Sequence, residues 1–174
     1  MRCLDRAVHV VGTSRRHASP DVTGGWVNAV KGFGRIFELA VDVLLERVKP
    51  DIIVNPAAYT EVDKAEAEPT IAHAVNAQAP KVLARYAARH NIPIIHFSTD
   101  YVFNGEKRNP QGDLCAYEEN DACDPIGVYG ASKRAGEVAI TEQAGRHLIL
   151  RTSWVYSDFG KNFMLTMLRL AKER

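Results

Sequence analysis

Apolar residues occur along this chain in two patterns, short continuous runs and longer stretches with helical spacing. Four continuous runs have the length of strands that are buried on both faces, namely residues 7–12, 51–55, 92–97 and 147–151. Four stretches have apolar residues at helical spacing, namely residues 36–48, 65–90, 128–143 and 162–172. Strands that alternate with helices predict an α/β fold with a doubly wound, Rossmann-like parallel sheet.

Turn-forming residues divide these elements. Gly105, Pro110, Gly112 and Pro125 predict a long loop over residues 104–125. Within the helical stretch 65–90, Asn76 fits a helix cap and Pro80 fits a break or a first turn. We therefore expect two elements in that stretch rather than one.

Composition narrows the class of protein. The chain has 174 residues, of which 46% are hydrophobic and 25% charged, and a formal charge of +1. This charge provides no basic field for nucleic acid or anionic lipid, and no apolar run reaches the roughly 20 residues of a membrane span. Cys3, Cys115 and Cys123 lack C-x-x-C spacing, which is typical of reduced thiols. We expect a cytoplasmic protein with neither nucleic-acid nor membrane partners.

Polar clusters follow three of the predicted strands, at residues 55–64, 98–101 and 152–156. Parallel strands bring their carboxyl ends to one edge of the sheet, and ligands of such folds bind at that edge. The helix that carries Tyr129 and Lys133 lies between the second and third clusters in sequence. A tyrosine four residues before a lysine shares a helix face with it. We expect the Lys133 charge to lower the pKa of the Tyr129 phenol and make it an acid–base group.

Four segments together resemble one enzyme family. They are Asn55–Glu66 (NPAAYTEVDKAE), Ser98–Gly105 (STDYVFNG), Val128–Lys133 (VYGASK) and Arg151–Tyr156 (RTSWVY). Their order and composition resemble the dTDP-4-dehydrorhamnose reductases, which are extended short-chain dehydrogenases/reductases. The resemblance runs from about residue 50 to the C-terminus.

The resemblance implies catalytic roles for three residues. Tyr129 would protonate the C4 keto oxygen as hydride arrives from NADPH or NADH. Lys133 would tune the phenol and hold the nicotinamide ribose, and Thr99 would hydrogen-bond the reacting oxygen. Donors aimed at that oxygen stabilise the charge that develops on it.

The resemblance also implies binding residues. Asp100 and Trp154 match positions that contact the dTDP-sugar, together with Thr99. Ala57, Ala58 and Thr60 match the loop that passes over the cofactor. The full-length protein of this family could be a homodimer.

Structural roles compete with these functional ones. Thr99 could satisfy backbone groups at a strand end, Asp100 could form a turn, and Trp154 could be core or loop packing. Asp63, Glu66 and Glu68 fit an acidic helix start better than a metal site, and we expect no metal. His9, His96 and His147 lie in strand-like runs and are predicted to be hydrogen-bonded structural residues.

The N-terminal part departs from the family pattern, because no glycine-rich turn follows a first strand. The run 8–12 resembles the family's second strand. Arg15 and Arg16, which follow it, favour NADPH, and a solvated loop explains them equally well. We expect residues 1–174 to form a partial NAD(P)-binding domain, without the first β–α unit and without the C-terminal substrate domain. The chain therefore looks like a fragment.

Two other functions stay open. One is a nucleotide-sugar epimerase or dehydratase, although a dehydratase would carry an Asp-Glu pair after Thr99 and this chain has Asp100 and Tyr101. The other is a non-catalytic or truncated homologue, such as one resembling the regulatory subunit of methionine adenosyltransferase.

Overall fold

In the part of the chain that the structure describes, the fold is built on a parallel sheet of three strands. The structure is a computed structural model and describes residues 34–158 and 162–173. Its strands are β1 (Ile53–Asn55), β2 (Ile94–Thr99) and β3 (His147–Thr152), which pair in that order. Ile53 pairs with Ile94, and Ile94 pairs with His147. Three predicted strands and their parallel arrangement are thus confirmed, and the run 7–12 lies outside the described residues.

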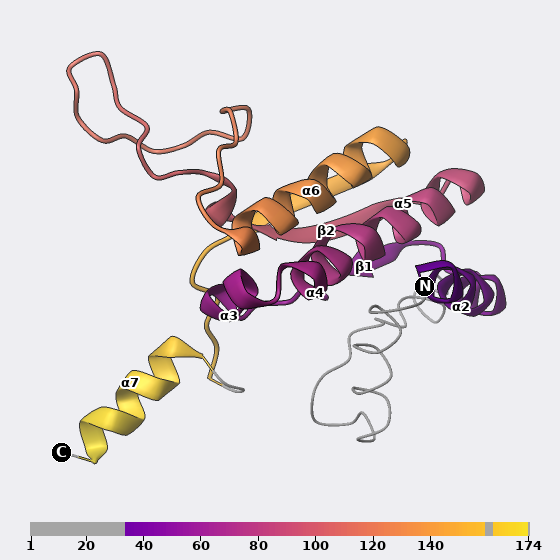
Figure 1. Ribbon diagram of the computed structural model, residues 1–174, viewed down its shortest axis with the longest axis horizontal. Helices are drawn as coiled ribbons and strands as arrows, with labels where there is room; N and C mark the ends of the chain where they lie inside the picture. The colour runs from indigo at the N-terminus through magenta and orange to yellow at the C-terminus, as the bar shows by residue number, and fades with distance from the viewer. Residues whose placement is uncertain (1–33, 159–161, 174) are drawn as a thin grey trace, which may run out of the picture.

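Helices connect the strands and cover the sheet. In chain order they are α2 (Gly34–Val48), α3 (Val62–Ala67), α4 (Pro69–His73), the π-helical turn η1 (Ala74–Gln78), α5 (Ala79–His90), the 3₁₀ turn η2 (Asp100–Val102), α6 (Val128–Gln143) and α7 (Phe163–Lys172). In Figure 1, α5 and α6 lie side by side in front of the strands. They pack on the sheet because each supplies an apolar face over β2.

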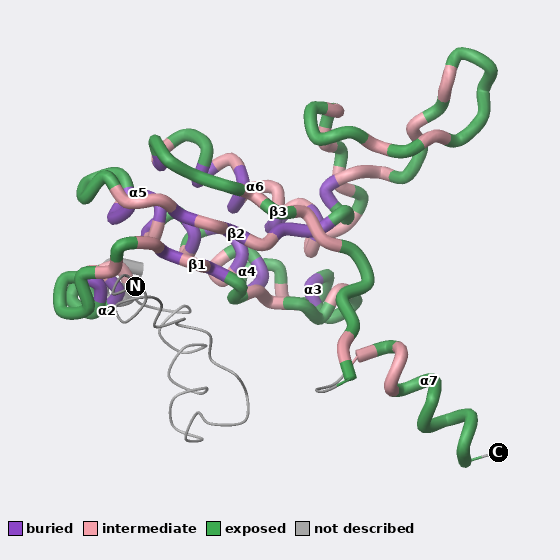
Figure 2. The backbone as a smooth tube through the Cα atoms, turned by 180° about the vertical axis from the view of Figure 1, so that it is seen from behind, coloured by how far each residue is buried: buried purple, intermediate pink, exposed green. Residues whose placement is uncertain are grey.

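The hydrophobic core lies between the sheet and these helices. It contains Val41 and Leu45 of α2, Ile53 and Ile94 of the strands, and Ile140 of α6, with several residues of α5. Figure 2 shows the buried residues gathered along β1, β2 and the inner sides of the helices. Removing these side chains from water is the main term that holds α2, α5 and α6 to the strands.

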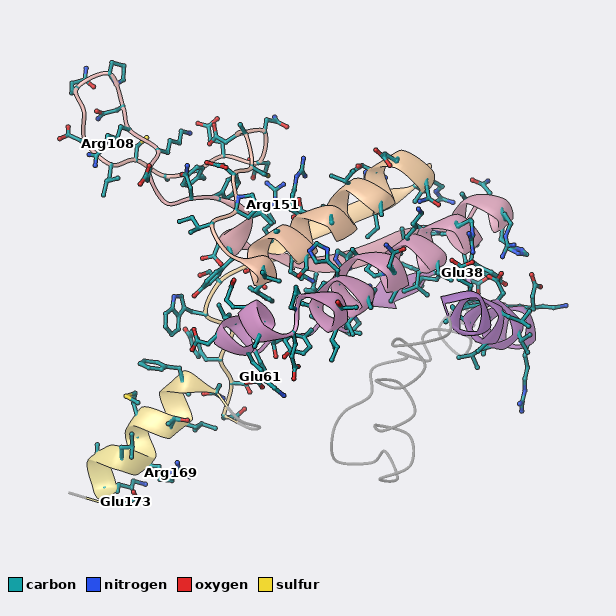
Figure 3. The ribbon with its side chains drawn as sticks, viewed as in Figure 1. Glu38, Glu61, Arg108, Arg151, Arg169 and Glu173 are labelled. Atoms are coloured by element: carbon teal, nitrogen blue, oxygen red, sulfur yellow. The ribbon has the colours of Figure 1, made fainter. Side chains whose placement is uncertain are left out.

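Ion pairs fix α2 along α5. Arg85 binds Glu38 at 3.0 Å, and Arg89 binds Asp42 at 2.7 Å. The Glu38 side chain is labelled in Figure 3, at the contact between the two helices. These side chains are partly exposed, so each pair contributes at most about 1 kcal/mol.

The predicted helical stretch 65–90 is three helices and a turn. Pro69 starts α4, and η1 joins α4 to α5. The sequence suggested that Asn76 caps a helix. The structure instead places it inside η1, where it is fully buried. Its amide accepts a hydrogen bond from the Tyr59 backbone N–H (2.8 Å) and donates to the Ser132 hydroxyl (2.9 Å). The π-helical turn therefore brings a polar side chain to the contact between the β1 loop and α6.

Two parts of the chain project from this body. The predicted long loop is confirmed between η2 and α6, and it extends away from the sheet in both Figure 1 and Figure 2. Tyr117 organises it by accepting hydrogen bonds from the backbone N–H groups of Glu106 (2.9 Å) and Lys107 (3.1 Å). Helix α7 also stands away from the sheet, and none of its residues is buried. Within the described ranges, no helix combines the length and the apolar character needed to cross a membrane.

Candidate active site

Thr99 lies at the carboxyl end of β2, where the strand turns into η2. Its side chain is 5% exposed, accepts a hydrogen bond from the Tyr101 backbone N–H (3.2 Å) and lies 3.1 Å from Asp100 Oδ1, to which it donates. The structural role considered for this threonine, satisfying a backbone group at a strand end, is therefore present. It does not exclude a catalytic role, because a hydroxyl can donate and accept several hydrogen bonds.

Tyr129 reaches Thr99 from the first turn of α6. The helix approaches η2 closely because residue 130 is glycine: a Cβ there would lie 2.2 Å from the Tyr101 carbonyl oxygen. Burial raises the pKa of the Tyr129 phenol. The Thr99 side chain lowers this pKa, and the negative charge of Asp100 raises it further. The expected lowering of this pKa is therefore wrong for this structure, in which the phenol keeps its proton at neutral pH.

Lys133 lies one turn further along α6 and is buried at 2% exposure. Its ammonium donates to the Phe97 carbonyl oxygen (2.6 Å) and lies 3.5 Å from His96 Nε2. Burial lowers the pKa of Lys133 to about 8, and the negative Glu137 opposes that shift. The amine thus contacts β2, which explains why burial rather than Lys133 dominates the pKa of Tyr129.

A buried pair that the sequence did not assign to the site lies behind Lys133. Asn55 Nδ2 is 3.0 Å from His96 Nδ1, and both residues are buried. His96 was predicted to be a hydrogen-bonded structural residue, which is confirmed, as it is for His147, whose Nδ1 lies 2.9 Å from the Ala144 carbonyl. The sequence did carry a signal for this pair, because two polar residues stand at positions of otherwise apolar strands.

The loop after β1 carries the residues expected to face the cofactor. Ala57 donates its backbone N–H to Asn55 Oδ1 (3.3 Å), and Tyr59 is fixed to Asn76. Ala57 and Thr60 are exposed and Ala58 is partly exposed. These small side chains leave the loop backbone accessible at the sheet edge where β1 and β2 end. The structure therefore brings this loop to the same edge as Thr99.

The start of α6 is held by the preceding helices. The Glu66 carboxylate accepts a hydrogen bond from the Val128 backbone N–H (2.7 Å), which satisfies a free donor of the first turn. Glu68 accepts from the Tyr59 hydroxyl (2.8 Å), and Asp63 stands in the first turn of α3. The three acids thus act separately. Across the described residues, no three His, Cys, Asp or Glu side chains gather closely enough to ligate a metal ion.

Asp100 and Trp154 lie at the ends of β2 and β3. Ser153 donates its hydroxyl to Asp100 Oδ2 at 2.6 Å, which joins the two strand ends. Trp154 is 70% exposed, has a φ of 50° and meets the Phe163 ring edge-on at 5.1 Å between ring centres. Core packing does not explain this tryptophan, since its ring is largely open to solvent.

An ion cluster that the sequence did not indicate supports the other side of α6. Arg151 binds the fully buried Glu137 through two hydrogen bonds of 2.8 and 2.9 Å. The same guanidinium donates to the Glu119 carbonyl (3.1 Å) and stacks 5.0 Å from the centre of the Phe103 ring. Figure 3 shows Arg151 at the base of the long loop, beside α6. A hollow of about 1300 Å³ lies between that loop, α6 and β3, with Tyr129 and Asp100 in its wall.

Comparison with known proteins agrees with this arrangement. The family model of the RmlD substrate binding domain matches residues 37–174. The dTDP-4-dehydrorhamnose reductase of Salmonella typhimurium is 48% identical over 130 residues, which are 75% of this chain and 42% of that protein. The enzyme of the same name from Escherichia coli K12 is 52% identical over 127 residues, or 73% and 40% of the two chains. The chain therefore spans less than half the length of the curated relatives it matches.

Solved structures show the same fold. The dTDP-4-dehydrorhamnose reductase of Bacillus anthracis, in complex with NADP, has a TM-score of 0.72 and 39% identity over 79% of this chain and 47% of its own. The Clostridium acetobutylicum reductase has a TM-score of 0.71 and 38% identity over 78% and 46%. The expected Rossmann-like parallel sheet, here partial, is thus confirmed. The chain belongs to the family of the RmlD substrate binding domain.

Proposed function

We propose that this chain is part of an NAD(P)H-dependent reductase that converts dTDP-4-dehydro-L-rhamnose to dTDP-L-rhamnose. The observation that carries the proposal is the position of Tyr129 beside Thr99 at the carboxyl end of β2, near enough for the Thr99 side chain to lower the pKa of the phenol, with Lys133 one turn further along α6. The names of the relatives indicate the substrate, and the NADP complex of the Bacillus anthracis protein indicates the cofactor.

The residues at the sheet edge fit a nicotinamide cofactor. Ala57, Ala58 and Thr60 would pass over it, and Lys133 would hold its ribose hydroxyls with a buried amine. When bound, the cofactor supplies the hydride. The small side chains of the loop leave its backbone reachable. NADPH is favoured over NADH by the bound NADP of the Bacillus anthracis relative.

Tyr129 is the proton donor in this proposal. Burial raises the pKa of its phenol, so the group holds a proton at neutral pH and can transfer it to an oxygen that gains negative charge. Thr99, near the phenol, would hydrogen-bond the same oxygen and stabilise its charge. A positive Lys133 near the phenol would favour release of the proton.

Asp100, Thr99 and Trp154 would bind the dTDP-sugar. The exposed Trp154 ring offers a flat apolar face, and the Asp100 carboxylate offers hydrogen-bond acceptors at the adjacent strand end. We also propose that the longer protein acts in the cytoplasm and forms a homodimer.

Deuterium transfer tests this function. The full chain is mixed with NADPH that carries deuterium on the transferred position and with dTDP-4-dehydro-L-rhamnose, and the product is analysed by mass spectrometry. Reductase activity predicts oxidation of the cofactor and one deuterium at C4 of dTDP-L-rhamnose. Cofactor binding without any turnover would contradict the proposal and favour a non-catalytic homologue.

A further inference from the structure

A line of buried polar groups runs from the β1 loop to the catalytic helix. Asn55 lies between the Ala57 backbone and His96, and His96 lies between Asn55 and Lys133. Asn55, His96 and Lys133 are all at least nine-tenths buried, so water does not substitute freely for their partners. The donors and acceptors along this line can therefore be assigned one after another.

The orientation of the Asn55 amide is fixed by the loop. A backbone N–H can only donate, so the atom that faces the Ala57 N–H at 3.3 Å is the amide oxygen. The amide nitrogen then faces His96 Nδ1 at 3.0 Å. Turning the amide over would set its nitrogen against the Ala57 N–H, so that two donors would face each other, which is costly for buried groups.

The Asn55 amide in turn fixes the tautomer of His96. The amide nitrogen only donates, so Nδ1 must accept and carries no proton. The proton of the neutral ring is therefore on Nε2. Burial lowers the pKa of His96 to about 4, with the Lys133 charge as the second cause, which agrees with a neutral ring at pH 7.

The Nε2–H group points toward Lys133 Nζ, 3.5 Å away. A neutral amine has a lone pair that can accept from this N–H, whereas an ammonium has three donors and no acceptor. Two other groups act in the opposite sense, since the Phe97 carbonyl accepts from Nζ (2.6 Å) and Glu137 is negative. Tyr129, one turn before Lys133, is neutral at pH 7, because the ordinary pKa of a phenol lies near 10 and burial raises it further.

We propose that His96, oriented by Asn55, is a positioning residue that favours the neutral amine of Lys133 over the ammonium. The proposal rests on the proposed reductase function only for its consequence. There, the positive charge of Lys133, which would hold the ribose hydroxyls and favour proton release from Tyr129, is lost as the pH rises past the pKa of Lys133, which burial lowers to about 8. Turnover should therefore decline above about pH 8 in the unaltered chain.

The tautomer is tested on the unaltered full chain. Nitrogen-15 NMR of the histidine rings separates protonated from unprotonated nitrogens, and a His96→Gln variant assigns the signal. We expect Nε2 protonated and Nδ1 unprotonated at pH 7. A proton on Nδ1 would overturn the proposal without any need for the variant to be active.

The effect on the lysine is measured in the His96→Gln variant, in which no ring N–H faces the amine and a side-chain oxygen can accept from it. Titration of Lys133 by NMR of labelled lysine should show its pKa raised by roughly one unit. His90→Gln is the matched control, because His90 lies on the surface against Glu46 at 3.0 Å, and it should leave the Lys133 pKa unchanged. An unchanged or lowered pKa in His96→Gln would overturn the proposal.

Turnover separates the two claims. With the reductase active, the alkaline decline of its rate should move to higher pH in His96→Gln and stay in place in His90→Gln. A Lys133 pKa that shifts in a chain without turnover would leave the inference standing and remove the proposed function. Turnover together with a Lys133 pKa that does not change in His96→Gln would leave the proposed function standing and overturn the inference.

Discussion

Replacing Gly130 by alanine tests whether the close approach of α6 to η2 holds Tyr129 against Thr99. An added Cβ would lie 2.2 Å from the Tyr101 carbonyl oxygen and 3.0 Å from Pro125 Cβ, whereas ordinary contacts begin at 3.4 Å. The helix and the turn must therefore move apart by about 1 Å, because the obstacle is backbone and the surroundings are closely packed. Tyr129 is the preceding residue, so its phenol moves with the helix.

The magnitude follows from two opposed terms. Alanine favours a helix over glycine by about 1 kcal/mol. Overpacking costs roughly 1–3 kcal/mol, and the upper part of that range applies here, because a backbone oxygen leaves little room to relax. We expect a net loss of about 1–2 kcal/mol in the free energy of unfolding, and a Tm lower by roughly 2–8 °C for a chain of this size. A displacement of 1 Å at the reacting groups costs about 100-fold in turnover.

Urea and thermal unfolding measure the first effect, and cofactor oxidation with the sugar nucleotide measures the second. Gly145→Ala is the matched control, because a Cβ at residue 145 would meet nothing within 4 Å. It should change neither stability nor turnover appreciably. A Gly130→Ala variant with unaltered Tm and unaltered kcat would refute the reasoning that this glycine sets the Tyr129–Thr99 contact.

Three further predictions concern the charges around α6. Glu137→Gln leaves its two arginine partners without a counter-charge and should lower the free energy of unfolding in urea by about 3 kcal/mol, unlike the exposed Glu142→Gln. The pKa of His96 is about 4 when folded against 6.5 when unfolded, so between these values the unfolded chain binds the extra proton. Stability should fall by about 3 kcal/mol as pH drops from 6.5 to 4, and His96→Gln should flatten that slope; an equal slope would contradict the assignment. Glu66→Gln weakens the hydrogen bond from the Val128 N–H and should cost about 1 kcal/mol in thermal unfolding; no loss would show that this carboxylate does not support α6.

The elements were predictable where local pattern and burial agree. The continuous apolar run before Thr99 became β2, and the helical spacing over 128–143 became α6, because both are covered by packed neighbours. The division of residues 65–90 was not predictable in detail. Asn76 lies in a π-helical turn because it bonds groups 17 and 56 residues away in sequence, and no local spacing indicates such partners.

The sequence predicted which residues lie near the carboxyl ends of the strands, but not the electrostatics of those residues. The family resemblance implied that Thr99 and Tyr129 face one oxygen, and in the structure the Thr99 side chain is near enough to lower the pKa of the Tyr129 phenol. The spacing of a motif does not show how deeply its side chains are buried, so the raised pKa of Tyr129 was missed. The Lys133 amine binds a carbonyl 36 residues away in sequence, on a strand that the pattern could not place beneath it. The roles of Ala57, Ala58, Thr60, Asp100 and Trp154 in binding stay predictions.

The most direct measurement of the central claim is kcat for Tyr129→Phe, with NADPH and dTDP-4-dehydro-L-rhamnose at saturation. Tyr101→Phe is the matched control, since its half-exposed ring packs edge-on against Tyr129 at 5.6 Å between centres. Loss of the proton donor predicts a kcat lower by about 10²–10⁴-fold in Tyr129→Phe, with cofactor binding retained and Tyr101→Phe close to the unaltered chain. Equal kcat in Tyr129→Phe and the unaltered chain would contradict the assignment of this phenol as the acid.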